Sequence, residues 1–561
     1  MPEFDAIVIG SGITGGWAAK ELCEKGLKVL VLDRGKAITP EKDFTTALMP
    51  PWKIPLRGLP DRELYEADYP IQSQSYAFDE TTRHFFNRDS ANPYVYDPQQ
   101  PFIWTRADVV GGKSLLWNRQ VYRFSDLDFE ANLRDGHGND WPIRYRDIQD
   151  WYSYVERFVG VSGEALGLPH LPDSEFQPPM ELNHVEKVLR QSLATHYDNR
   201  HLTIGRVAIQ TEARNGRGAC TYCFKCERGC TFNAAFSSLN ATLPAARATG
   251  NLTLRGNSVV EAIDYDPATA SASAVRVIDA QTGERSRVSA KLIFLCGSTV
   301  GSTQILLNST SETFPDGLGN RSGVLGRYLT EHTTADGAVG LVPGYLDKYP
   351  YGYRPNGLYI PRFRNLSADD EGLDFVRGYN FQGGAMRPGW DLNYKLIPGF
   401  GKEFKQAMQG PGPWVMYLVG FGEVLPRYEN RVYLHPTLKD RFGIPQVAFD
   451  FHNSPNEDAL RADLIREAKT MLELAGAVGV QTFASNQPGR SIHEMGTARM
   501  GKDPATSFLN GWNQSHEVPN LFVTDGACMP SASCVNPSLT FMALTARAAD
   551  YAVQQLRAGL I

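Results

Sequence analysis

The stretch DAIVIGSGITGGWAAKELCEKGLKVLVLD, residues 5–33, decides the fold. Residues 5–9 are a short apolar run that predicts a buried strand, and residues 10–16 form a glycine-rich turn. Residues 17–25 have a helical pattern, and residues 28–33 predict a second buried strand. Strand, turn, helix and strand in this order are typical of a βαβ unit, so the sequence predicts an α/β protein with a parallel sheet.

The glycines of this turn have the spacing of a dinucleotide-binding site. Gly10, Gly12 and Gly15 form the pattern GxGxxG, and Asp33 follows at the end of the second strand. Glycines at these positions let the backbone approach a pyrophosphate, which then lies at the helix N-terminus. Asp33 can accept hydrogen bonds from a ribose. We therefore predict dinucleotide binding rather than a purely structural turn, and this pattern by itself does not distinguish FAD from NAD.

Length and composition limit the possible classes of protein. A chain of 561 residues predicts more than one domain. The net charge of −6 argues against nucleic acid or anionic membrane as a partner. No apolar run has the roughly 18–20 residues that a transmembrane helix needs. The start Met1–Asp5 lacks a basic region, so we expect no secretory signal peptide.

Four of the eight cysteines lie within eleven residues, with the pattern C-x2-C-x2-C-x3-C formed by Cys220, Cys223, Cys226 and Cys230. This spacing matches bacterial ferredoxins, whose thiolates hold an iron–sulfur cluster, although Thr231 follows where ferredoxins usually have proline. Structural zinc usually takes two cysteine pairs separated by a longer loop, and disulfides would require export without metal. We favour a cluster over zinc, disulfides or free thiols.

The second half of the chain predicts a different architecture. Residues 330–450 are rich in Tyr, Phe, Gly and Pro, and alternating runs such as residues 431–434 favour an antiparallel sheet. Ser454-Pro455 begins a long amphipathic helix, and a final helix is predicted near residues 539–556.

Four further segments carry a resemblance to a known family. They are RADVVGGKSLLWNRQVYR at 106–123, CGSTVGSTQILL at 296–307, HEMGTARMG at 493–501, and LFVTD at 521–525 followed by Asn536-Pro537. In this order and spacing they resemble the flavin-binding and active-site motifs of the glucose–methanol–choline (GMC) oxidoreductases. The resemblance extends over nearly the whole chain.

The resemblance implies FAD, oxidation of an alcohol hydroxyl by hydride transfer to flavin N5, and a fold of two domains. One is a discontinuous Rossmann-like FAD-binding domain, and the other is a substrate domain with an antiparallel sheet. The expected FAD-binding segments are 1–160, 205–325 and 480–561, with the iron–sulfur insert near 218–232. The expected substrate-binding segments are 161–204 and 326–479.

The resemblance also implies which residues contact FAD. These are Gly10, Gly12, Ile13, Thr14, Gly15, Asp33, Arg34, Arg106, Gly111, Gly112, Ser114, Asn118, Val259, Gly297, Asp525, Gly526, Asn536 and Pro537. In the related pyranose oxidases a histidine of this region is bonded covalently to the flavin. Leu116 stands at the corresponding place, so we expect non-covalent FAD.

Alcohol oxidation requires a base that takes the hydroxyl proton, and histidine suits this role near neutral pH. His493 occupies the place of the family's base, and Asn536 that of the second active-site residue, which is His or Asn among members. Asn536 can position the substrate oxygen but cannot titrate. His84, His452 and His516 have no such context and receive no role.

The cysteine segment is similar to the catalytic subunits of bacterial FAD-dependent sugar dehydrogenases, which carry a [3Fe–4S] cluster. Their ligand spacing C-x5-C-x3-C selects Cys220, Cys226 and Cys230. Cys223 is then either a non-ligand or the fourth ligand of a [4Fe–4S] cluster, and we favour the three-iron type. The similarity also implies a c-type cytochrome or another external acceptor, and a small subunit whose export signal carries this chain to the periplasm. Without such a subunit we expect the cytoplasm.

We therefore predict an FAD-dependent dehydrogenase that oxidises a sugar or glycoside hydroxyl, with C3 of a glucoside as first choice and electrons leaving through the cluster. Alternatives within the class are an oxygen-using sugar or alcohol oxidase, and a dehydrogenase of glucose, fructose or gluconate at another position. Alternatives from other classes are a non-catalytic flavin-binding interaction protein and an NAD-dependent reductase with structural zinc.

Overall fold

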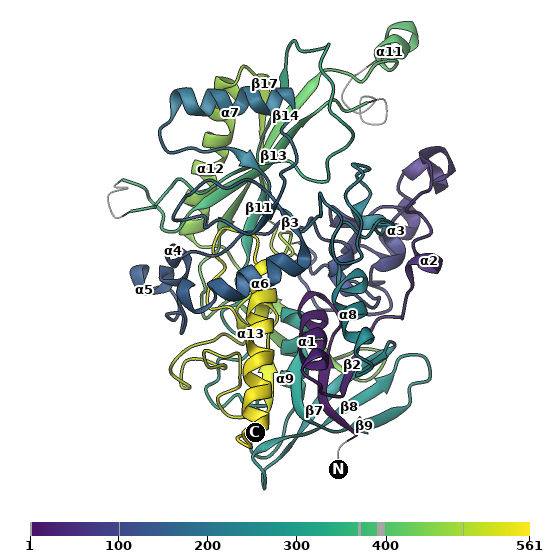
Figure 1. The fold of residues 1–561 in the computed structure, drawn as a ribbon, viewed down its shortest axis with the longest axis vertical. Helices are drawn as coiled ribbons and strands as arrows, with labels where there is room; N and C mark the ends of the chain where they lie inside the picture. Colours follow the sequence, from purple (N-terminus) through teal and green to yellow (C-terminus); the bar gives the residue numbers. More distant parts are fainter. Residues whose placement is uncertain (1–2, 100, 368–371, 390–398, 486) are drawn as a thin grey trace.

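The computed structural model describes residues 3–99, 101–367, 372–389, 399–485 and 487–561. Residues 1–2 of the predicted N-terminal segment, and residues 368–371 and 390–398 of the region predicted as antiparallel sheet, lie outside the described residues. Figure 1 shows the parallel-sheet half with both chain termini at the bottom and the antiparallel half at the top. The parallel sheet and the large antiparallel sheet therefore lie in different halves of the molecule.

The lower half is built on a five-stranded parallel sheet with the order β18-β10-β1-β2-β6. Its strands are β1 Phe4–Ile9, β2 Val29–Leu32, β6 Leu252–Arg255, β10 Ala290–Leu295 and β18 Leu521–Val523. Ile9 is paired with Leu32 on one side and with Leu295 on the other, so distant segments meet at one end of the sheet. The predicted βαβ unit is confirmed, because α1 (Ile13–Glu24) connects β1 to β2.

Helix α1 begins at Ile13, four residues before the predicted start at residue 17, because two of the turn's glycines belong to the helix. A Cβ on Gly15 would lie 1.9 Å from the Gly10 carbonyl oxygen, and one on Gly16 would lie 2.3 Å from Thr242 Oγ1. These glycines therefore allow close packing of the helix rather than a longer turn.

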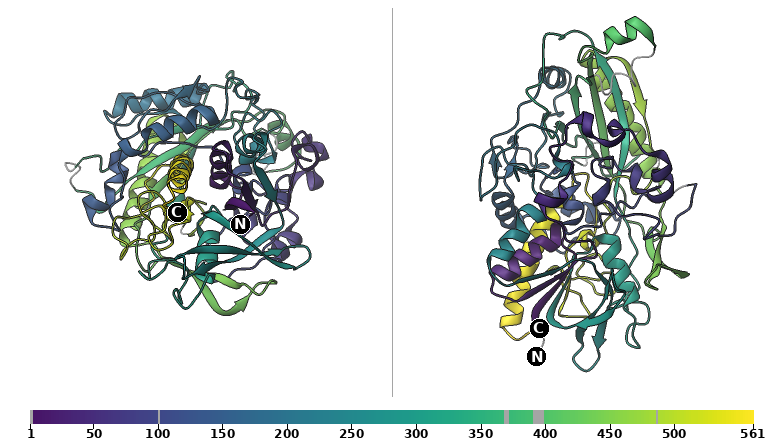
Figure 2. Two further views of the ribbon diagram at one scale, coloured as in Figure 1. Left: turned by 60° about the horizontal axis from the view of Figure 1, so that its bottom comes forward. Right: turned by 90° about the vertical axis from the view of Figure 1, so that its right-hand side faces the viewer.

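Helices cover one face of the parallel sheet, the face of Ala6 and Val8. The predicted C-terminal helix is confirmed as α13 (Ser538–Arg557), which packs against α1 and α6 (Gln149–Val159). Figure 2 shows α13 and α1 side by side. Helix α8 (Thr242–Ala248) also packs on α1, and α9 (Thr299–Asn308) follows β10. A three-stranded antiparallel sheet covers the other face, the face of Ile7 and Ile293, and is formed by β7 Ser258–Asp266, β8 Ser271–Asp279 and β9 Arg285–Val288.

The upper half is a six-stranded sheet with the order β17-β11-β14-β13-β12-β5. Its strands are β5 Thr203–Ile204, β11 His332–Val342, β12 Leu358–Ile360, β13 Tyr379–Met386, β14 Trp414–Glu423 and β17 Val478–Phe483. All its pairings are antiparallel, as predicted. Helices α7 (His184–His196) and α12 (Pro455–Leu474) pack against it, and Gly420 brings Leu464 of α12 close to β14.

Residues 431–434, an example used to predict this sheet, lie elsewhere. They belong to β15 (Arg431–Lys439), which pairs with β16 (Pro445–Asp450) as a separate hairpin. This hairpin packs on α9 beside the parallel sheet, because Val432 and Val447 are buried in a cluster with Phe102 and Val300.

Short elements connect these parts. They are α2 Pro40–Asp43, α3 Arg62–Asp68, α4 Asp126–Phe129, α5 Ala131–Asp135, β3 Val161–Ser162, β4 Phe176–Gln177 and α11 Gly401–Ala407. The predicted domain boundary between residues 479 and 480 falls within β17, and the domain limits remain predictions.

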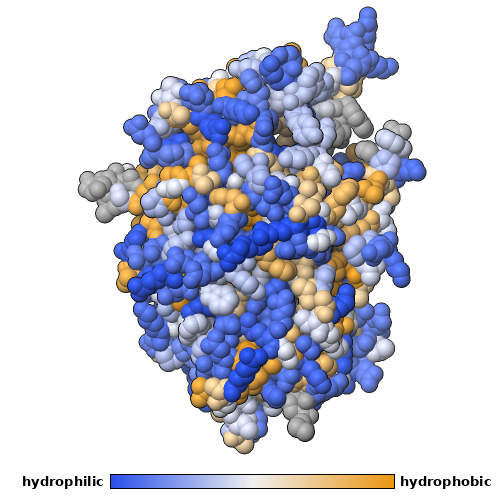
Figure 3. All heavy atoms as spheres, viewed as in Figure 1, coloured by the Kyte–Doolittle hydropathy of each residue, from blue (hydrophilic) through white to orange (hydrophobic). Residues whose placement is uncertain are grey.

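Within the described residues, no helix is both long and apolar enough to cross a membrane. On the face seen in Figure 3, hydrophilic side chains cover most of the surface, and hydrophobic side chains lie between them in scattered groups.

Candidate active site

A cavity of about 400 Å³ lies between the two large sheets. The ends of β1 and β2 and the turn after β10 form one side of it. The opposite side includes Thr334 of β11, Gln382 of β13 and Phe421 of β14. Ligands of open α/β sheets bind outside the carboxyl ends of the strands, which is where this cavity begins.

The turn after β1 is shaped for close approach of a ligand. Gly10 has φ of +96°, and a Cβ at this position would lie 2.4 Å from the Cys296 carbonyl oxygen, so a side chain has no room. Asp33 accepts hydrogen bonds from Ser11 N at 2.8 Å and Gly35 N at 2.7 Å. Burial raises the pKa of Asp33 to about 6 despite these hydrogen bonds. The Asp33 carboxyl is thus held at the cavity wall, where the sequence placed a ribose.

Most residues predicted to contact the cofactor line this cavity. They are Gly10, Gly12, Ile13, Thr14, Asp33, Arg34, Arg106, Gly112, Ser114, Asn118, Val259, Gly297, Asp525, Gly526 and Asn536. Gly15, Gly111 and Pro537 do not line it. Gly15 lies against Gly10, the Gly111 N–H donates to Ser11 Oγ at 2.8 Å, and Pro537 precedes α13. These three residues shape the wall from behind.

Several buried polar atoms of the wall have no hydrogen-bond partner in the part of the chain that the structure describes. They are Asn87 Nδ2, Trp104 Nε1, Thr105 Oγ1, Arg106 Nε and Glu494 Oε1, and only Arg106 is a residue predicted from the sequence. Unpaired buried polar groups are costly, so such atoms indicate a polar ligand in the cavity. Together with the glycine turn and Asp33, they fit a dinucleotide.

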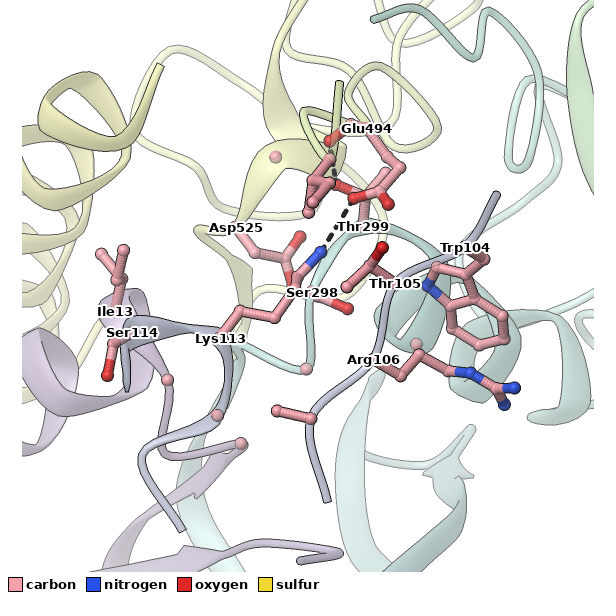
Figure 4. A pocket seen from close by; sticks show the side chains of 18 of the residues that line it. Ile13, Trp104, Thr105, Arg106, Lys113, Ser114, Ser298, Thr299, Glu494 and Asp525 are labelled. Carbon is pink, nitrogen blue, oxygen red and sulfur yellow. Dashed lines mark hydrogen bonds and ion pairs between the residues drawn. The ribbon is translucent and has the colours of Figure 1, made fainter. Parts of the chain in front are cut away.

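An ion pair connects the glycine segment to the loop of the predicted base. Lys113 Nζ lies 3.0 Å from Glu494 Oε2, and Figure 4 shows the Lys113 side chain reaching across the pocket beside Asp525. The Glu494 carbonyl oxygen accepts a hydrogen bond from Thr299 Oγ1. Residues 113 and 494 are far apart in the chain, so this contact holds two walls of the cavity together.

His493 and Asn536, the predicted catalytic pair, do meet in this cavity, with His493 Nε2 3.5 Å from Asn536 Nδ2. A second histidine, which the sequence did not reveal, lies behind them. His332 Nδ1 is 2.8 Å from His493 Nδ1, and His332 Nε2 is 2.9 Å from the Ser533 carbonyl oxygen. Burial lowers the pKa of His332 to about 4, so this ring is neutral near pH 7.

These contacts define the tautomer of His493. A carbonyl oxygen can only accept, so His332 Nε2 carries the proton and His332 Nδ1 has a lone pair. His493 Nδ1 must then donate to His332, which leaves the lone pair of neutral His493 on Nε2. Burial and the Lys113 ammonium lower the pKa of His493 well below its ordinary value. His493 is therefore a neutral base whose free nitrogen faces Asn536.

The loop of His493 is supported by another group that the sequence did not reveal. Glu331 Oε1 accepts from Gly489 N at 2.6 Å, and Glu331 Oε2 accepts from Ser491 Oγ at 2.7 Å. The His493 N–H in turn donates to Ser491 Oγ at 3.3 Å. Burial raises the pKa of Glu331 to about 8. Neither Glu331 nor His332 lies in a recognisable motif; His332 is the first residue of β11, and Glu331 directly precedes it.

The four clustered cysteines line a second, smaller cavity of about 60 Å³. All are free thiols; Cys226 is buried, Cys223 exposed, and Cys220 and Cys230 lie between these extremes. Among the described residues, no group of three or more His, Cys, Asp or Glu side chains is arranged to hold a metal ion. The structure and the comparisons with known proteins therefore give no support for zinc or for the cluster.

Comparison with family models shows to which family the chain belongs. Residues 4–334 and 426–545 match the two family models described as GMC oxidoreductase. The chain is a GMC oxidoreductase. The predicted fold is confirmed as the GMC oxidoreductase fold, with its parallel and antiparallel sheets.

Individual GMC relatives cover almost the whole chain. It is 28% identical to 2-methyl-1,2-propanediol dehydrogenase of Mycolicibacterium austroafricanum, over 98% of this chain and 95% of that protein. It is 25% identical to the fructose dehydrogenase large subunit of Gluconobacter japonicus, over 99% and 98% of the two chains. Among solved structures, pyridoxine 4-oxidase, whose source is given as Mesorbium loti, superposes with a TM-score of 0.61 at 17% identity, covering 98% and 99% of the chains.

GMC oxidoreductases bind FAD, and the glycine turn, Asp33 and the unpaired polar atoms of the cavity fit this cofactor. The chain is an oxidoreductase acting on CH–OH groups. This identification removes the NAD-dependent reductase and the non-catalytic flavin-binding protein from the alternatives.

Proposed function

We propose that this GMC oxidoreductase is an FAD-dependent dehydrogenase that oxidises a hydroxyl of a sugar or glycoside, with C3 of a glucoside as the first candidate. The observation that carries the proposal is the His493–Asn536 pair at the cavity, with the free lone pair of His493 on Nε2. A hydroxyl between these two side chains can donate its proton to His493 while its oxygen accepts from the Asn536 amide.

Bound FAD supplies the acceptor for the hydride that leaves the carbon. The residues of the chain supply the rest. His493 takes the hydroxyl proton on Nε2, and His332 receives the hydrogen bond from Nδ1, which stabilises the imidazolium that forms. Asn536 orients the oxygen through its NH2 group. Leu116, at the cavity wall, offers no atom for a covalent bond to the flavin, which supports non-covalent FAD.

The lining of the cavity supports a neutral, hydroxyl-rich substrate. Among the described residues, the six-stranded sheet contributes Thr334, Gln382 and Phe421 to the wall, and none of these is charged. A hydroxyl group such as that of Thr334 recognises sugar hydroxyls by hydrogen bonds, and an aromatic ring such as that of Phe421 covers the apolar face of a sugar. The Phe421 ring centre lies 6.2 Å from that of His493, so such a face would lie next to the base.

We also propose that Cys220, Cys226 and Cys230 hold an iron–sulfur cluster, of the three-iron type if Cys223 is not a ligand. Such a cluster would pass electrons on one at a time to an external carrier. A cluster binds each thiolate to a different iron, so its sulfurs lie further apart than around one zinc ion. The four thiols line one cavity, and the proposal rests on their spacing in the sequence.

A buried arginine places this cysteine loop beside the flavin segment. Arg119 is 2% exposed, and its guanidinium donates to the carbonyl oxygens of Leu115 at 2.9 Å, Trp117 at 2.5 Å and Cys226 at 3.3 Å. The main chain of Cys226 is therefore one side chain away from the residues that flank Leu116. This proximity is what an electron relay from flavin to cluster would need.

For the carrier we propose a c-type cytochrome or another one-electron acceptor. For localisation we propose the periplasm, reached with a small subunit that has its own export signal. Both proposals rest on the similarity of the cysteine segment to the sugar dehydrogenases, and co-expression with a neighbouring small gene, followed by cell fractionation, tests the second.

A dye-reduction screen over free sugars, glycosides and diols tests the function, with NMR of the product to identify the oxidised carbon. A glycoside oxidised anaerobically with a dye, with little hydrogen peroxide in air, supports a dehydrogenase. Stoichiometric hydrogen peroxide in air would instead identify an oxidase.

A further inference from the structure

Gln382 is a cavity residue that lies outside every motif of the sequence. It lies in β13 of the six-stranded sheet, and its Nε2 donates to Asn536 Oδ1 at 2.7 Å. Asn380, two residues earlier and on the same face of the strand, donates to the Cys534 carbonyl oxygen. Strand β13 therefore contacts the loop before α13 at two points, and one of these is the side chain of Asn536.

Gln382 completes a chain of hydrogen bonds in which each donor and acceptor is fixed by the preceding contact. The chain begins at the Ser533 carbonyl oxygen, which can only accept, and passes through His332 to His493 Nε2. At that nitrogen only a donor fits, so Asn536 must present its NH2 group there. The remaining atom of the Asn536 amide is the acceptor Oδ1, and Gln382 donates to it.

We propose that Gln382 is a positioning residue that holds the Asn536 amide with its NH2 group toward His493 and the reacting hydroxyl. This inference rests on the proposed roles of His493 and Asn536. Without Gln382, the Asn536 amide can rotate and present Oδ1 to the lone pair of His493, which orients neither the substrate oxygen nor its proton.

The Gln382→Glu variant tests the direction of the chain, because a carboxylate accepts where the amide donates. We expect turnover about 100-fold below wild type at pH 8, because Asn536 then turns its NH2 group toward Glu and its oxygen toward His493. As the pH falls, the introduced carboxyl becomes protonated and can donate again. Turnover relative to wild type should therefore rise about tenfold between pH 8 and pH 5.

The histidines and tyrosines around Gln382 and Asn536 do not titrate in this range, whereas Glu331, which supports the His493 loop, titrates near its upper end in both enzymes alike. Burial lowers the pKa of His493 and that of His332 to values well below neutral. Tyr359, paired with Gln382 across the strands, and Tyr122, stacked on Tyr359, are buried, which raises the pKa of each far above this range. Groups elsewhere in the protein titrate equally in wild type, so the ratio of the two enzymes reports the introduced carboxyl.

The assay follows reduction of dichlorophenolindophenol by the FAD-loaded enzyme. The probes are methyl β-D-glucopyranoside, D-fructose and 2-methyl-1,2-propanediol, and the one that wild type oxidises fastest is used throughout. The matched control is Gln481→Glu, the same change at an exposed glutamine of β17 in the same sheet. Its ratio to wild type should stay constant with pH.

A second pair of variants keeps the test decisive if Gln382→Glu does not fold. Gln382→Ala should lower kcat about tenfold with little change in KM. In an Asn536→Ala background the same change should have almost no further effect, because Gln382 acts through Asn536. Equal effects in both backgrounds, or a change in KM alone, would show that Gln382 contacts substrate directly and would overturn the proposal.

Failure of the inference can be told apart from failure of the proposed function. A ratio of Gln382→Glu to wild type that is flat from pH 8 to pH 5 overturns the role of Gln382 while wild type still oxidises a probe. A wild type that oxidises none of the three probes, or a His493→Ala variant with normal turnover, overturns the proposed function and this inference with it.

Discussion

Replacement of His332 tests whether the second histidine controls the tautomer of the base. In His332→Leu, the His493 Nδ1–H loses its acceptor at 2.8 Å in a site where His332 itself is 2% exposed. An unsatisfied buried donor costs about 1–3 kcal/mol. If this energy is lost from the reacting tautomer, kcat should fall about 5- to 150-fold.

His332→Asn is the matched variant, because its side-chain oxygen can accept the same hydrogen bond. We expect its kcat to fall less than that of His332→Leu. Neutral His332 also accepts the Nδ1–H bond that stabilises the His493 imidazolium, so removing this acceptor should lower the pKa of His493 further and move the acid limb of the kcat profile to lower pH. The sign follows because His493 works as the neutral base.

The measurement is kcat at saturating substrate as a function of pH, for preparations with equal flavin content. His516→Leu removes another partly buried histidine, one outside the cavity, and should leave kcat unchanged. Equal losses in the Leu and Asn variants of His332 would point to packing rather than to the acceptor. A His332→Leu enzyme with wild-type kcat and an unmoved acid limb would refute the tautomer argument.

Further experiments test the remaining assignments. His493→Ala should keep FAD bound and lower turnover by about 10² or more, because the base is lost. Asn536→Ala should lower turnover less, because His493 can still accept the proton. Stopped-flow bleaching of the flavin by sugar measures both effects. Acid precipitation should release FAD into the supernatant because Leu116 cannot bond to it, and a yellow pellet would contradict this. Cys226→Ser should lose iron and slow reduction of a one-electron carrier while sugar still bleaches the flavin; wild-type carrier rates would make the cysteines structural. Retained iron in Cys223→Ser indicates three ligands, and its loss indicates four.

The sequence predicted those parts of the fold that depend on local pattern. The βαβ unit, α12 and α13 follow from short-range periodicity and capping residues, and the structure confirms them. Gly15 and Gly16 were predicted to belong to the turn, although they lie in α1. They are glycines because they contact Gly10 and Thr242, and the sequence alone does not show which residues come into contact. Residues 431–434 were assigned to the wrong sheet for a similar reason: their alternating pattern indicates a strand but not which strand it pairs with.

The candidate site divides in the same way. His493 and Asn536 lie in motifs with fixed neighbours, so the resemblance revealed both. His332 and Gln382 lie at places where only the register of β11 and β13 brings them to the cavity. Neither residue has a local signal, because a lone His or Gln in an apolar strand is compatible with many environments.

The order of strands in the parallel sheet has a consequence for how the protein is made. β1 has β10 as a neighbour, and β10 pairs with β18, so the sheet joins residues 4–9 to residues 521–523. At about 5–20 residues per second, a ribosome needs about 25–100 s between completing β1 and completing β18. During this time one edge of the sheet is always unpaired, because β1 waits for β10 until residue 295 and β10 then waits for β18. The nascent chain is therefore exposed to aggregation, and FAD can be enclosed only after translation has nearly ended.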